Sequence, residues 1–153
     1  MSARVAVDRL IEALAQAEGG LPAGSRFRPW LARARTDLLD LGAAGRIAPE
    51  RIDWLEARLD ELVRERPAWP LLAVPASPAA MRLRRAALLS RRAARLVRRD
   101  RGDRESAAYL FALGRLLAAI AHRLDGDAAA HVRERVPLPH ATRRALSGGL
   151  APG

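Results

Sequence analysis

The chain has 153 residues, of which half are hydrophobic and only 4% aromatic, and it carries a formal net charge of +10. Its length suits one domain with a sizeable core, and the lack of cysteine excludes disulfides and thiolate metal sites. Alanine and leucine dominate, and no stretch alternates apolar and polar residues as a strand does. We therefore predict an all-α protein that forms a single bundle of five to six helices.

Five segments have apolar residues at the three- and four-residue spacing of an amphipathic helix. In chain order they span residues 3–18, 28–41, 49–66, 78–99 and 104–124. Two of them begin at a proline in the favoured first position, Pro49 and Pro78. Gly42 and Gly126 are expected to end the second and the fifth segment. A short sixth helix is predicted at 128–136.

The fifth segment is predicted to lie at the centre of the core. Its apolar residues fall within about 120° of arc when they are placed at 100° per residue. These residues are Tyr109, Leu110, Leu113, Leu116, Leu117, Ile120 and Leu124. We place the helical bundle domain at residues 1–136 and expect a flexible C-terminal tail at 137–153.

The sequence gives no sign of a membrane segment, a metal or a cofactor. The longest apolar stretch, 107–121, is shorter than the roughly 20 residues of a membrane span, and no early apolar run resembles a secretory signal. We therefore expect a soluble cytoplasmic protein with no membrane partner. The three histidines, His122, His131 and His140, are scattered. No metal-binding spacing or Gly-rich phosphate loop is present, so we expect neither metal nor cofactor.

Positive charge is concentrated in one segment of the chain. Residues 82–104 contain ten arginines and two aspartates, which amounts to +8 of the total charge of +10. On a helical projection of residues 78–99, Leu83, Leu89 and Leu96 lie on the side that we expect to pack on the core. Seven of the arginines share another side, spread over about 140°. We call this side the arginine face: Arg84, Arg85, Arg91, Arg92, Arg95, Arg98 and Arg99.

A face of a single charge sign predicts a polyanionic partner, because close like charges repel each other unless something compensates them. Nucleic acid is the preferred candidate, and a membrane surface or an acidic protein are the alternatives. No aromatic residue interrupts the face. We therefore expect contacts to phosphates rather than to stacked bases.

Arg115 and His122 form the only pair with a catalytic pattern. They are seven residues and about 20° apart on the fifth segment, on the side away from its apolar stripe. This spacing resembles that of small helical ribonucleases of the HEPN type, in which arginine stabilises phosphate charge and histidine handles a proton. That motif has a polar residue after the arginine, whereas Leu116 follows here. We therefore expect no enzyme, with the ribonuclease as the alternative.

Three segments carry a family resemblance. Residues 25–31 read Ser-Arg-Phe-Arg-Pro-Trp-Leu, residues 81–91 read Met-Arg-Leu-Arg-Arg-Ala-Ala-Leu-Leu-Ser-Arg, and residues 119–126 read Ala-Ile-Ala-His-Arg-Leu-Asp-Gly. In order and spacing they resemble motifs of the small subunit of type III-A CRISPR effector complexes. Those motifs are Ser-x-Ile-Arg-x-Phe-Leu, Leu-basic-x-basic-x-Ala-Tyr-x-Ala-Gly-Arg and Val-Ala-Tyr-His-Lys-x-x-Gly. The chain departs from them at Ala87 and Ala121, which replace tyrosine.

The resemblance implies a non-enzymatic helical bundle that contacts single-stranded target RNA without reading its bases. It implies other effector-complex subunits as partners and leaves self-association open. Carried over residue by residue, the matching positions are Arg28, Arg84, Arg91 and His122. Besides the HEPN-type ribonuclease, a helical adaptor that docks an acidic protein partner through the arginine face remains an alternative.

Overall fold

The computed structural model describes residues 1–65 and 77–135, and these residues form helices with no strand among them. The five helices are α1 (Ala3–Gly19), α2 (Phe27–Ala44), α3 (Pro49–Arg64), α4 (Pro78–Arg101) and α5 (Arg104–Arg135). The prediction of an all-α bundle is confirmed. The predicted tail at 137–153 lies outside the described residues.

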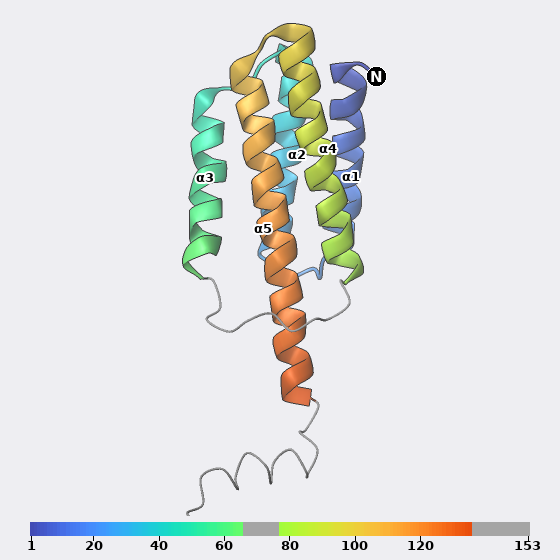
Figure 1. Cartoon of the computed structure of the whole chain (residues 1–153), viewed down its shortest axis with the longest axis vertical. Coiled ribbons are helices and arrows are strands. Elements are labelled where there is room, and N and C mark those ends of the chain that lie inside the picture. The colour runs from blue at the N-terminus through green and yellow to red at the C-terminus, as the bar shows by residue number, and fades with distance from the viewer. Residues whose placement is uncertain (66–76, 136–153) are drawn as a thin grey trace, which may run out of the picture.

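The helices run roughly parallel to one long axis, with α5 at the centre (Figure 1). The most extensive contact joins α4 to α5, and α1 packs on α4, α2 on α1, and α3 on α5. Neighbours in the pairs α1–α2, α1–α4 and α4–α5 are antiparallel, whereas α3 and α5 descend in the same direction in Figure 1. In that view α2 runs behind α4 and α5.

Local sequence explains both ends of α4. The Ser77 hydroxyl accepts a hydrogen bond from the Ala80 N–H at 3.1 Å, and Pro78 occupies the first turn, which together satisfy the helix start. The helix ends at Gly102, which adopts a left-handed φ of 64° that other residues rarely adopt. The start follows the sequence prediction, which placed it at Pro78, whereas the helix continues two residues beyond its predicted end at residue 99.

Two predicted helix ends are wrong. The second helix continues past Gly42 and ends at Gly45, whose φ is 81°. The fifth helix continues through Gly126, so residues 128–135 of the predicted short helix are the last part of α5, and residue 136 lies outside the described residues. A glycine inside a helix costs about 1 kcal/mol relative to alanine, and it stops the helix only where a left-handed backbone is needed.

The core is built around α5, as predicted. Tyr109, Leu113, Leu117 and the other predicted core residues up to Ile120 are all buried, whereas Leu124 is only half-buried. The Tyr109 hydroxyl donates a hydrogen bond to buried Asp37 of α2 at 2.8 Å, so its burial leaves no polar group without a partner. Burial and the Asp37 carboxylate both raise the pKa of Tyr109, which keeps this donor protonated.

Small residues bring α4 and α5 close together. The Ser90 hydroxyl donates to the carbonyl of Leu110 at 2.6 Å. A Cβ atom at Gly114 would lie 3.3 Å from the Ala87 carbonyl oxygen and 3.2 Å from Arg91 Cγ, which is tighter than ordinary contact. The backbones therefore meet where neither helix has a large side chain.

This contact rotates the buried stripe of α4 away from its predicted position. Leu89 and Leu96 were expected on the core side but are only half-buried. Their place is taken by the small residues of the stripe, which face α5: Ala87, Ser90 and Ala94. The close packing of α4 on α5 favours small side chains over large apolar ones at these positions. A pattern of hydrophobicity along the sequence does not reveal this preference.

By length and composition alone, the stretch Arg104–Ala128 of α5 is long and apolar enough to cross a membrane. The expectation that no stretch is long enough therefore does not hold on these two criteria. In the bundle, 56% of its most apolar window is buried against other helices. A central core helix meets the same criteria, so this feature identifies a core helix as readily as a membrane span.

We expect Leu117→Ala to lower the free energy of unfolding by about 2–5 kcal/mol, because the side chain is fully buried at the centre of α5. The matched control is Leu88→Ala on α4, where the leucine is 65% exposed, and we expect a change of no more than about 0.5 kcal/mol there. Urea denaturation followed by circular dichroism measures both values. Equal effects of the two substitutions would contradict this assignment of the core.

Candidate nucleic-acid interface

The arginine face lies on the solvent side of α4. Six of its seven arginines are exposed, and Arg91 is half-buried. Two exposed apolar side chains, Met81 and Leu88, lie among them. The helix places Arg84 and Arg98 about 21 Å apart along its axis, at a rise of 1.5 Å per residue. The face is therefore a strip of positive charge along most of the helix.

One edge of the arginine face borders α5. Arg84 forms an ion pair with Asp125 of α5 at 2.5 Å, and the stem of Arg91 lies over Gly114. Arg98 lies nearer the turn between the helices and lines a hollow with residues of α5. The exposed ridge of α5, formed by Ala108, Phe111, Arg115 and His122, is therefore continuous with the arginine face.

The centre of the face lacks compensating charge. Among residues 1–65 and 77–128, no carboxylate lies within 4.0 Å of the guanidinium groups of Arg85, Arg92 or Arg95. Arg98 and Arg99 belong to the last turn of α4, where positive charge is stabilised by the helix dipole. That explanation does not extend to the three central arginines.

Two charged residues of α4 support α1 instead of the face. Asp100 accepts a hydrogen bond from the Ala3 N–H at 3.0 Å, at the start of α1. An ion pair with Arg99 at 2.7 Å, together with this N–H group, lowers the pKa of Asp100. At the other end of α1, the Arg82 guanidinium lies against Gly20. Each charge sits at the end of α1 whose dipole it complements.

Arginines of the other helices are largely engaged. Arg51 contacts Asp40 at 2.8 Å and Asp37 at 3.1 Å, and Arg35 contacts Glu18 at 2.7 Å. The remaining pairs and ring contacts join Arg26 to Glu65, Arg123 to Glu65 and Asp127, and Arg33 and Arg58 to the ring of Trp54. These arginines outside α4 therefore help to hold the bundle together.

The predicted pair Arg115 and His122 lies on the exposed ridge of α5. Arg115 is 57% exposed and its guanidinium is 4.0 Å from Glu56 of α3. His122 lies one helical turn before Asp125, the partner of Arg84. His122 therefore lies at the border of the arginine face, whereas the ion-pair contact of Arg115 is with α3. Both side chains are exposed.

The predicted site residue Arg28 lies elsewhere. It is half-buried near the start of α2, which runs behind α4 and α5 (Figure 1). On α2 it shares a side with Arg35, seven residues later, and Arg35 pairs with Glu18 of α1. Arg28 therefore faces the α1 side of its helix, apart from the arginine face.

Phe111 and Arg104 belong to this surface and were not predicted. A hollow of about 220 Å³ lies between the last turn of α4 and the first turns of α5. It is lined by Arg98, Arg104, Ala107, Ala108 and Phe111. The sequence-based expectation that no aromatic residue interrupts the arginine face concerns α4, and Phe111 comes from α5. A helical projection of residues 104–124 would have found Phe111, since it falls about 100° outside the apolar arc of α5.

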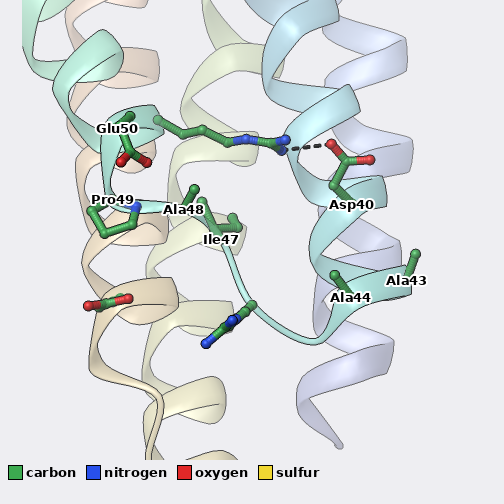
Figure 2. A pocket seen from close by; sticks show the side chains of 10 residues that line it. Asp40, Ala43, Ala44, Ile47, Ala48, Pro49 and Glu50 are labelled. Carbon is green, nitrogen blue, oxygen red and sulfur yellow. Dashed lines mark ion pairs between the residues drawn. The ribbon is translucent and has the colours of Figure 1, made fainter.

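A second hollow, of about 590 Å³, lies at the connection between α2 and α3 (Figure 2). Its lining mixes the carboxylates of Asp40, Glu50 and Glu105 with two arginines, and one of these arginines is held by Asp40, as the dashed line in Figure 2 shows. This balance of charge does not favour a polyanion. Within the described part of the chain, no group of three metal-ligating side chains is close enough to hold an ion.

No protein-family model matches the chain, and no curated protein matches it either. The arrangement of charge on α4 and α5 is therefore the basis for the functional argument.

We expect wild-type protein to leave single-stranded RNA intact, and His122→Ala to leave its binding nearly unchanged. The reason is that His122 is exposed at the border of the face and adds at most one contact. Gel analysis of RNA incubated with both proteins, together with anisotropy titrations, measures this. Cleavage by the wild type that disappears in His122→Ala would favour the ribonuclease alternative.

Proposed function

We propose that this protein binds single-stranded RNA through its phosphates, without reading the base sequence, and that the arginine face with the adjoining ridge of α5 is the binding surface. In this proposal the protein is a non-catalytic small subunit of a CRISPR ribonucleoprotein effector complex. Other effector subunits and further copies of the chain would be its neighbours in that assembly.

The observation that carries the proposal is the contrast between two sets of arginines. Four of the six arginines of α2 and α3 are engaged by carboxylates or aromatic rings, namely Arg33, Arg35, Arg51 and Arg58. In contrast, Arg85, Arg92 and Arg95 cluster on α4 with no carboxylate within 4.0 Å among residues 1–65 and 77–128. Folding accounts for the first set. Clustered charges without a partner repel each other, so an external polyanion accounts for the second.

The geometry suits a phosphate backbone. The strip is about 21 Å long, so an extended single strand can meet several of its arginines at once. Each phosphate that is neutralised releases counterions, which supplies affinity without sequence preference. The exposed guanidinium groups are free to follow a flexible strand.

The family resemblance adds support from separate parts of the sequence. Arg84 and Arg91 come from one motif and His122 from another, and all three lie along the border between α4 and α5. Arg28, from the third motif, lies apart on α2. Two of the three motifs thus converge on the surface proposed for RNA.

We expect the affinity for single-stranded RNA to fall with salt at a log–log slope near −3 if about four arginines engage, at about −0.7 per phosphate. Replacing Arg92→Gln together with Arg95→Gln should weaken binding about equally for different sequences. The same change should flatten the slope by about 1 to 1.4. Both residues are exposed, so the substitutions leave the fold intact.

The matched control is Arg46→Gln together with Arg64→Gln, which removes two exposed arginines outside α4, one in the connection between α2 and α3 and one at the end of α3. It lowers the net charge by the same amount, and we expect it to change the slope little. Equal weakening by both double variants would contradict the proposed surface. Equal affinity for RNA and for polyglutamate would favour an acidic protein as the partner.

A further inference from the structure

Phe111 is the one aromatic side chain among the exposed large hydrophobic residues of the described chain, and it is 38% exposed. It lies where the arginine face approaches the turn between α4 and α5, in the hollow with Arg98 and Arg104. The tryptophans Trp30 and Trp54 are different, because arginine side chains lie over their rings. The ring of Phe111 is therefore accessible to a ligand at the end of the arginine face.

We propose that this hollow, the Phe111 hollow, binds one unpaired nucleobase of the RNA strand. The base stacks on the phenyl ring while Arg98 and Arg104 hold the phosphates on either side of it. The inference rests on the proposed function, since it requires an RNA strand along the arginine face. It adds a specific contact to a surface that otherwise recognises only charge.

The composition of the hollow supports a base rather than another occupant. Its charged lining consists of two guanidinium groups with no carboxylate, so it favours a ligand that carries negative charge beside an apolar plane. Ala107 and Ala108 are small and leave the ring accessible from α5. A nucleotide combines a flat aromatic base with a phosphate, and every base can stack on an aromatic ring whatever the sequence.

The stacking contact also gives the protein a means to prefer single strands. Bases in a duplex are already stacked on each other and are not available to an aromatic side chain at the surface. The arginines alone do not make this distinction, because both forms of RNA present phosphates. The preference for single-stranded over duplex RNA therefore depends on Phe111 in this proposal.

The test is Phe111→Leu, which keeps an apolar side chain and removes the aromatic ring. We expect its affinity for a short oligoadenylate to fall about ten-fold, a typical loss when one stacking contact is removed. Its affinity for inorganic polyphosphate, which has charge but no bases, should stay at the wild-type value. Phe111→Trp should retain the affinity for oligoadenylate. Anisotropy or competition titrations measure these affinities, and thermal unfolding confirms that each variant is folded.

The same titrations with a duplex of oligoadenylate and oligouridylate complete the test. Wild-type protein should prefer the single strand, and Phe111→Leu should lose most of that preference. Unchanged affinity of Phe111→Leu for oligoadenylate, or an equal loss for polyphosphate, would overturn base stacking at this hollow. If Arg92→Gln with Arg95→Gln still weakened binding in that case, the proposed RNA surface would stand. Failure of wild-type protein to bind oligoadenylate at low salt would overturn both proposals.

Discussion

The close contact between α4 and α5 determines which side of α4 meets solvent. The Ser90 hydroxyl reaches the Leu110 carbonyl, and Gly114 leaves room for the backbone at Ala87. Small residues on both helices make this approach favourable, and large ones would separate the helices. Once this side of α4 is buried, the arginines on its other side have no position except the surface. The charge distribution thus follows from packing, and the arginine face is as rigid as the helix pair that carries it.

This arrangement raises the question of why so much like charge is tolerated on one helix. Part of the answer is structural, since Arg82 and Asp100 complement the two ends of α1 and Arg84 is paired with Asp125. Arg85, Arg92 and Arg95 contribute little to the stability of the fold, because exposed ion pairs are worth at most about 1 kcal/mol and no carboxylate among residues 1–65 and 77–128 lies within 4.0 Å of their guanidinium groups. We propose that binding, and not folding, explains their placement. The exposed ring of Phe111 beside Arg98 supports the same proposal through a different kind of contact.

The sequence predicted the helices and the core well, because both depend on local patterns. Periodicity located all five helices, Ser77 and Pro78 marked the start of α4, and the apolar arc of α5 named the buried residues from Tyr109 to Ile120. The errors arose where tertiary packing decided the outcome. Gly42 and Gly126 lie inside helices, and the buried stripe of α4 shifted toward its alanines. For the candidate site, the arginine face could be read from one helix, whereas Phe111 and Arg104 join it only because α5 lies alongside α4.

We propose that RNA phosphates meet the arginines of α4 and not those that hold α2 and α3 together. Nuclear magnetic resonance of the arginine Nε–Hε groups during titration with a short single-stranded RNA distinguishes the two sets, because it reports each guanidinium in the intact protein. We expect the signals of Arg92, Arg95 and Arg98 to shift first, and those of Arg33 and Arg58, which lie over tryptophan rings, to stay in place. Shifts that begin at Arg33 and Arg58, with the α4 signals unmoved, would contradict it.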